Sequence, residues 1–333
     1  MSKPIEANFW TEHLLKQDAS LDFVKAGGSL VRFPIAENDK AHRSLVSALR
    51  SAKEQNQLAF FTVPSHACEI HRPDKVLSEL ASRWNTESYA TAVIRNVWKE
   101  LRYDASESIL LSDASRATGQ DPNPMFSRFN RNLRDLLGRG LNNQGSQLNS
   151  IRFNRDFANG AIASMISLIE GDDTELKIFE AWLRGERLTA ADRRSIGIMW
   201  PVKRDNATSI LRSMLAFSAL AGWTGSILHF DIRFVTDHAK YDEINSPNTY
   251  TKQKRIALYQ WLREIIDQTQ HFSKTVIVVE TGPTFIDQSQ FGIGIGIYDA
   301  LKNRIVDDVS LNDSAVANPC AIVVPISGDS YVR

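Results

Sequence analysis

The chain has 333 residues, 43% of them hydrophobic, which is enough for one large or two modest domains with a sizeable core. Its 39 Lys and Arg residues balance 39 Asp and Glu residues. This balance excludes a global electrostatic field that would draw the protein to nucleic acid, to a membrane surface or to acidic substrates. Any function that depends on charge must therefore be local.

Two cysteines, Cys68 and Cys320, are the whole cysteine content, and their number and separation do not suggest a disulfide framework. This usage favours a reducing compartment. The N-terminus lacks the unbroken apolar region of a signal peptide, and no stretch approaches the ~18 apolar residues of a membrane span. We expect a cytoplasmic protein.

The first part of the chain, residues 1–112, predicts a strand, a helix and a second strand. Residues 29–35 form the first apolar run, residues 41–57 have the spacing of an amphipathic helix, and residues 58–64 form a compact run typical of a buried parallel strand. Strand, helix and strand together make a βαβ unit.

Residues 113–200 predict a helical, Arg-rich insertion, and residues 201–333 predict a second α/β block. That block contains two further buried strands, at 225–235 and 274–281, with a helix at 254–270 between them. The alternation predicts an α/β fold with a parallel sheet, helices on both of its faces and a helical insertion.

The segment VRFPIAENDKAHRSLV has the outline of a phosphate-binding loop, G-x-x-x-x-G-K-[ST], between a strand and a helix. In that motif glycines let backbone N–H groups close around a phosphate, a lysine reaches its oxygens and a hydroxyl holds Mg²⁺. If the helix start sets the register, the glycine places fall near Ala36 and Ala41. The lysine place then falls on His42 and the hydroxyl place on Arg43.

The charges of this loop also oppose phosphate binding. Glu37 and Asp39 would repel a triphosphate, and the nearby cation, Lys40, comes two residues before the lysine place. These residues are compatible with a degenerate nucleotide site or with an ordinary strand-to-helix connection.

The strand SILHFDIRF resembles the second half of a nucleotide triphosphatase site, where an apolar run ends in two acids. There the first carboxylate holds Mg²⁺ through water and the second polarises the attacking water. Asp231 occupies the first place, but Ile232 occupies the second and can polarise nothing. The alternative is that Asp231 caps the strand or pairs with a neighbouring base.

A different enzyme class remains open around Asp231. Two residues that alternate along a strand share a face, so His229 and Asp231 can act together in a metal-assisted hydrolase. Asp237 and His238 follow closely, although no third ligand has a characteristic spacing. We expect no bound metal and no cofactor.

Residues 116–155 hold seven arginines, two aspartates and no Lys or Glu, a local charge of +5. The part MFSRFNRNLRDLLGRG interleaves arginines with Phe126 and Phe129. Arginine grips phosphates and aromatic rings stack on bases, so this part predicts a nucleic-acid-binding module. A solvated helix face or an acidic protein partner explains it equally well. The candidate binding residues are Arg128, Arg131, Arg134 and Arg139.

Five stretches occur in order over about residues 8–327: VRFPIAENDKAHRSLVSAL, LAFFTVPSHACEIHRPDKVLSEL, AWLRGERLT, ALAGWTGSILHFDI and VVETGPTFIDQSQFGIGIGIYDALKNRI. Together they resemble the P-loop ATP-binding proteins of bacterial BREX-type phage defence (the BrxD-like group). The resemblance implies a P-loop NTPase core of the AAA+-like type. It also implies that the nucleotide site lies at Asp39, Lys40, His42, Arg43, Asp231 and Ile232.

The departures from the family pattern indicate a pseudo-ATPase. Glycine loop, lysine, hydroxyl and second acid are all replaced, and losing one such group typically costs orders of magnitude in rate. We therefore expect a non-catalytic scaffold or regulatory subunit of an anti-phage defence or DNA-transaction complex. Its partners would be other protein subunits and possibly DNA, with no membrane. The chain stops about where the family continues into a C-terminal lid, so we expect that lid to be missing.

Overall fold

The computed structural model describes residues 5–7, 24, 26–64, 66–100, 124–139, 153–236, 250–286, 294–307 and 322–327. The chain divides into two compact units. The α/β unit comprises residues 1–76 and 224–333, and the helical unit comprises residues 77–223. Among the described residues, no helix has both the length and the apolar character needed to cross a bilayer.

The α/β unit is built on one sheet of six parallel strands in the order β1-β6-β2-β5-β4-β3. The strands are β1 (Ile5–Glu6), β2 (Ser29–Ala36), β3 (Leu58–Pro64), β4 (Gly225–Asp231), β5 (Thr275–Glu280) and β6 (Ile322–Ser327). The predicted fold class is confirmed, because a parallel sheet flanked by helices forms the core and a helical unit is inserted between β3 and β4.

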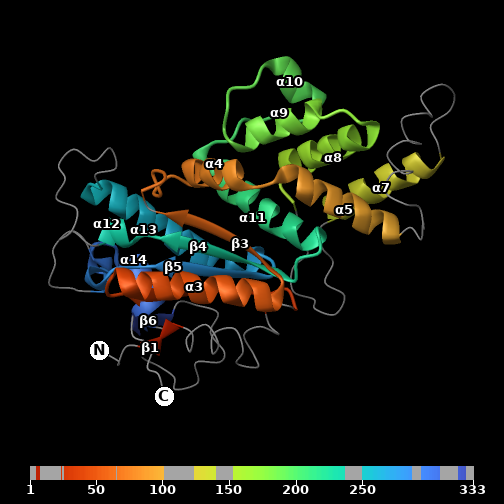
Figure 1. Ribbon diagram of the computed structural model, residues 1–333. Helices are drawn as coiled ribbons and strands as arrows, with labels where there is room; N and C mark the ends of the chain where they lie inside the picture. Colours follow the sequence, from red (N-terminus) through yellow and green to blue (C-terminus); the bar gives the residue numbers. More distant parts are fainter. Residues whose placement is uncertain are drawn as a thin grey trace. The chain divides into compact units, whose positions relative to one another are not determined.

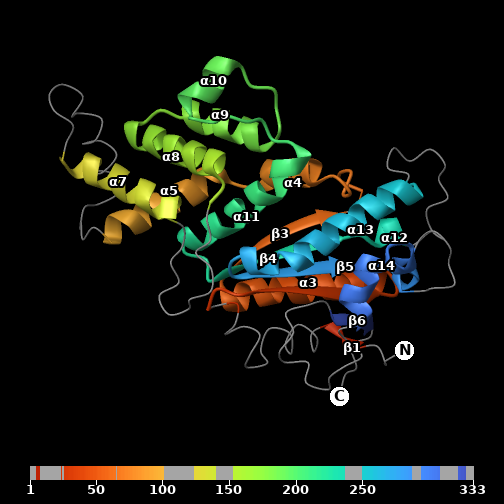
Figure 2. The same ribbon diagram turned by 180° about the vertical axis from the view of Figure 1, so that it is seen from behind.

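Helices cover both faces of this sheet (Figures 1 and 2). From β2 the chain crosses to β3 at the far edge, and from β3 it returns through β4 and β5 to β6. Right-handed crossovers in opposite directions place their helices on opposite faces. Figure 1 accordingly shows α3 in front of the sheet, and Figure 2 shows α13 and α14 in front of the other face. The helical elements are α3 (Asp39–Asn56), α12 (Arg233–Thr236), α13 (Lys252–Asp267), α14 (Asp299–Lys302) and the short turns η2 (Thr269–His271), η3 (Pro283–Phe285), η4 (Ile295–Ile297) and η5 (Asn303–Asp307).

The two faces of the sheet are filled by alternate residues of each strand. Ile227 of β4 joins the buried cluster that includes Leu45 and Leu49 of α3. Phe230, three residues later, points the other way and packs edge-on against Trp261 of α13 at a centroid distance of 5.5 Å. Because successive side chains of a strand point to opposite faces, residues two apart lie on the same face of the sheet, and this decides which polar residues face α3.

Helix α3 has clear start and stop signals. The side chain of Asn38 accepts a hydrogen bond from the backbone N–H of Ala41 and caps the N-terminus. Gln57, in the left-handed conformation at φ 52°, ends the helix. The cap at Asn38 therefore starts the helix two residues after the end of β2.

The helical unit packs around Phe157 of α8. Its ring lies 5.4 Å from that of Phe179, 5.8 Å from Phe217 and 6.2 Å from Trp84. Burying a side chain of this size contributes about 1.5–3 kcal/mol. The helices are α4 (Pro73–Arg83), which spans the boundary between the units, α5 (Thr86–Glu100), α7 (Pro124–Arg139), α8 (Arg155–Glu170), α9 (Thr174–Leu183), α10 (Ala190–Ser195) and α11 (Arg204–Leu220).

The bounds of the helical unit differ from those of the predicted insertion. The sequence placed the insertion at 113–200, whereas the compact unit runs from Leu77 to Trp223. The reason is visible at Trp84 and Phe217, which lie outside 113–200 yet pack on Phe157. Helical periodicity shows that these side chains are buried but does not show in which core.

Candidate functional site: an ion cluster at the carboxyl ends of the strands

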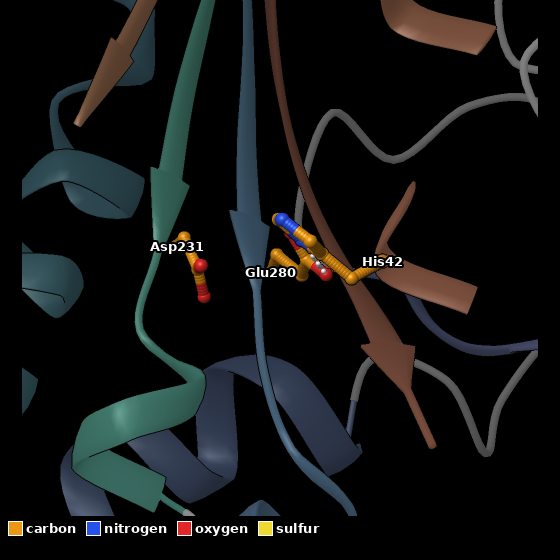
Figure 3. Close-up of side chains that lie close together, drawn as sticks. All are labelled: His42, Asp231 and Glu280. Carbon is orange, nitrogen blue, oxygen red and sulfur yellow. Dashed lines mark hydrogen bonds and ion pairs between the residues drawn. The ribbon is translucent and has the colours of Figure 1, made fainter. Parts of the chain in front are cut away.

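The candidate site lies where the strand order of the sheet reverses. β2 sits between β5 and β6, so the chain leaves it toward one edge and later pairs with it from the other side. In open α/β sheets, ligands bind outside the carboxyl ends of the strands at such a switch point. His42 of α3, Asp231 at the end of β4 and Glu280 at the end of β5 meet here (Figure 3).

Glu280 is the centre of the cluster, and its side chain is fully buried. Nδ1 of His42 lies 2.9 Å from both carboxylate oxygens, and Nε2 of His229 lies 3.0 Å from Oε2. A carboxylate only accepts hydrogen bonds, so both imidazole nitrogens donate to it. On the other side of the ring, Nδ1 of His229 lies 3.0 Å from the Thr62 hydroxyl.

The ionised form of Glu280 is strongly stabilised. Burial by itself raises the pKa of this carboxyl group, but the hydrogen bonds and charges of His229 and His42 outweigh it and lower the pKa to about 2. Glu280 is therefore a carboxylate at neutral pH. It is also a poor general base, because an efficient base has a pKa near the working pH.

Arg233, at the start of α12, supplies the cation of the cluster. Its Nε and Nη2 donate to the two oxygens of Asp231, each at 3.0 Å, and Nε also lies 3.2 Å from Oε1 of Glu280. Nη1 reaches Asp39 of α3 at 3.3 Å. Burial lowers the pKa of Arg233, but the hydrogen bond and charge of Asp231 and the charges of Glu280 and Asp39 outweigh it and raise the pKa. One guanidinium thus joins three carboxylates.

The connection between β2 and α3 consists of Glu37 and Asn38 alone. A phosphate-binding loop places several residues between its strand and the lysine so that backbone N–H groups can surround a phosphate. Here Ala36 still belongs to the strand and Ala41 already lies in the helix, where its N–H is bonded to the Asn38 side chain. The connection has no room for a phosphate cradle.

Comparison with known families identifies the chain. The family model described as "BREX system ATP-binding protein BrxC/D" matches residues 14–328. The chain belongs to this family. Membership gives the chain a role in phage defence and a P-loop NTPase type of fold. Among curated proteins and among solved structures, none matches the chain significantly.

The residues of this BrxC/D protein do not fit a Mg²⁺-bound triphosphate. The ligand atoms of His42, Asp231 and Glu280 lie within 4.8 Å of one another, a spacing that suits a metal ion. However, the guanidinium of Arg233 already lies within 3.2 Å of both carboxylates. A cation at this place would have to displace Arg233, and a triphosphate would meet the carboxylates of Asp39, Asp231 and Glu280.

Some of the predicted nucleotide-site residues lie in the cluster and the others do not. His42, Asp231 and, through Arg233, Asp39 are brought together. Lys40 and Arg43 are exposed. Ile232 is fully buried, and its N–H donates to the carbonyl of Glu280.

Sequence reasoning did not identify Glu280 or Arg233 as members of the cluster. It named His229 as a possible metal ligand but not as a hydrogen-bond partner of Glu280. A signal for Glu280 was present, because KTVIVVE, like SILHFD, is an apolar run that ends in an acid. Of the proposed metal ligands, Asp237 and His238 lie outside the described residues. The metal-assisted hydrolase therefore stays a prediction.

The Arg-rich part of the BrxC/D protein forms helix α7. Arg131 and Arg134 are exposed, and Nε of Arg134 donates to the side chain of Asn130 at 2.9 Å. Arg128 and Arg139 lie in the helix, but their side chains are outside the described residues, as is that of Phe126.

The proposed base-stacking role of Phe129 is wrong. Its side chain is fully buried and stacks on Trp98 of α5 at a centroid distance of 4.8 Å. Arg134 also borders a hollow of about 450 Å³ whose lining includes Glu170, Glu175 and Arg194, so acidic and basic side chains balance there. Nucleic-acid binding through the arginines of α7 stays a prediction.

Proposed function

We propose that this BrxC/D-family protein acts in phage defence without hydrolysing ATP, as a scaffold or regulatory subunit of a multi-subunit complex. The observation that carries the proposal is the clamp on Glu280. The switch point of the sheet is filled by a carboxylate that His42, His229 and Arg233 hold from three sides.

Electrostatics support the proposal. ATP-binding sites of this fold offer backbone N–H groups, a lysine and a metal ion to a highly negative triphosphate. The described cluster instead presents Asp39, Asp231 and Glu280, with one guanidinium shared among them. An incoming phosphate would be repelled, and binding would require the Arg233 network to open.

The chemistry of hydrolysis is also unsupported. Ile232 stands in the place of the acid that polarises water, and Asp231 is bonded to Arg233 through both oxygens. Removing a single electrostatic group of this kind typically costs about 10²–10³ in kcat. The replacement of several groups together leaves no route for phosphoryl transfer.

The same cluster can stabilise the sheet in a protein that no longer uses ATP. Its hydrogen bonds join β3, β4, β5 and α3 through Thr62, His229, Glu280 and His42. The ends of the strands are thus held together by side chains, without a nucleotide. A stable sheet can then carry interfaces to other subunits.

A phosphate-release assay tests the proposal. Purified full-length protein with ATP and Mg²⁺ is expected to give the same rate as Asp231→Asn, both at the level of the buffer blank. A P-loop ATPase of known activity serves as the positive control. Phosphate release that scales with protein concentration and disappears in Asp231→Asn would refute the proposal.

A further inference from the structure

Two large apolar side chains of the helical unit are exposed. Met199 is 57% exposed and Trp200 is 63% exposed. They follow α10 in the segment that leads to α11. Solvent exposure of such adjacent apolar side chains marks a candidate interaction site when their position is fixed.

The backbone of this dipeptide is fixed by side chains on all four of its polar groups. The two carboxylate oxygens of Asp156 accept from the N–H of Met199 at 3.1 Å and from the N–H of Trp200 at 3.0 Å. Nη1 of Arg193 donates to the Met199 carbonyl at 3.3 Å, and Nε1 of Trp182 donates to the Trp200 carbonyl at 2.9 Å.

Two of the three side chains that hold the dipeptide belong to the core of the unit. Asp156 is 7% exposed and Trp182 is 1% exposed. On the other side of the segment, the Asn159 side chain donates to the carbonyl of Gly197, which has a φ of +67°. Met199 and Trp200 therefore project from a rigid frame, which lowers the entropy lost when a partner binds.

The surroundings of the dipeptide are basic. From Arg193 to Arg204 the chain has four basic residues and no acidic one. Of the acids that flank this segment, Asp192 is bonded to the N–H and hydroxyl of Thr189, and Asp205 is exposed in the first turn of α11. The apolar pair is thus flanked along the chain by exposed Arg194, Lys203 and Arg204, which form the cationic rim. Arg194 also lines a hollow with Glu170 and Glu175.

We propose that Met199 and Trp200 form the docking point for an acidic segment of another protein that carries apolar side chains. Met, Trp and Arg are enriched at protein interfaces, and Trp and Arg dominate the binding energy. The acidic residues of the partner meet the rim, and its apolar residues cover Met199 and Trp200. This surface does not depend on whether the protein hydrolyses ATP.

Two other occupants fit less well. A second copy of the chain, paired by a two-fold axis, would bring the cationic rim against itself. Single-stranded nucleic acid stacks successive bases on aromatic side chains. Trp200 could stack one base, but the exposed neighbour, Met199, is not aromatic. The charge and the apolar pair together favour an acidic protein segment.

Fluorescence anisotropy with the full-length protein tests the proposal. The probe is a labelled helical peptide of about 16 residues, with Leu and Phe on one face and Asp and Glu elsewhere. We expect binding in the micromolar range, weakened at least ~10-fold by Trp200→Ala. Asp156→Asn, which removes one of the two acceptors that hold the dipeptide, and Arg204→Glu are also expected to weaken binding.

Matched probes and variants separate the outcomes. A peptide with Ser in place of Leu and Phe, and one with Lys in place of Asp and Glu, are expected to bind at least ~10-fold more weakly. Lys177→Ala, at a 70% exposed side chain of α9, is the control variant and should bind normally. No binding of the acidic probe overturns the proposal, as does equal binding by wild type and Trp200→Ala. Trp200-dependent binding of an oligo-deoxythymidine with no binding of the peptide would also overturn it.

Discussion

Glu280→Gln is expected to lower the free energy of unfolding at pH 7 by roughly 3 kcal/mol. The amide keeps the shape of the side chain but loses the negative charge. Its NH₂ group also faces His42, His229 and Arg233, which donate hydrogen bonds themselves. The expected size follows from the pKa, which is lowered from 4.5 to about 2 in the folded protein. Chemical denaturation followed by circular dichroism measures the difference.

The difference between wild type and Glu280→Gln should also depend on pH. Because the folded pKa lies below the unfolded value, the carboxylate stabilises the fold fully above about pH 4.5. That contribution is lost as the pH falls toward 2, where the wild-type group also becomes neutral. The two proteins should therefore converge in stability across this window.

Glu54→Gln is the matched control, since Glu54 lies exposed on the same helix as His42. Its effect on the free energy of unfolding should stay within about 0.5 kcal/mol. A Glu280→Gln protein as stable as wild type at pH 7 would show that the carboxylate clamp does not stabilise the sheet.

Arg233→Ala is expected to destabilise the fold by about 3 kcal/mol, because it leaves buried Glu280 and Asp231 without their shared cation. It should also create affinity for divalent cations. His42, Asp231 and Glu280 keep their ligand atoms within 4.8 Å of one another, and the guanidinium no longer fills the space among them. Addition of Mn²⁺ should raise the melting temperature of the variant.

Two control variants accompany Arg233→Ala. Arg233→Lys keeps a cation and should respond weakly to Mn²⁺, as should wild type. Arg263→Ala removes an arginine whose ion pair with Asp267 is partly exposed, and it should cost less than about 1 kcal/mol. Equal stabilisation of wild type and Arg233→Ala by Mn²⁺ would mean that Arg233 does not occupy a cation position.

Four of the six strands could be predicted from the sequence, and so could three residues of the cluster, Asp39, His42 and Asp231. Compact apolar runs identified β2, β3, β4 and β5, and an acid after a buried strand pointed to Asp231. Glu280 ends its strand in the same way, but its place beside Asp231 depends on β5 pairing with β4. Strand order comes from tertiary packing, so the sequence alone could not bring the two acids together.

The short β2–α3 connection and the role of Phe129 show two further limits. The alignment of the phosphate-loop motif assumed a longer loop between the strand and the helix. Strand β2 continues through Ala36, so that only two residues separate it from α3. Phe129 was read with its neighbouring arginines, whereas Phe129, Leu133 and Leu137 form the buried stripe of α7 at helical spacing. Periodicity was the better physical guide there, because burial excludes stacking on a base.

Isothermal titration of the full-length protein with ATP and Mg²⁺ tests the central claim most directly. In the described part of the site, Arg233 is already paired with Asp39, Asp231 and Glu280, and the N–H of Ala41 is bonded to the Asn38 side chain, so the expected result is the heat of dilution alone. A saturable isotherm with a Kd in the micromolar range, lost in His42→Ala, would contradict the account.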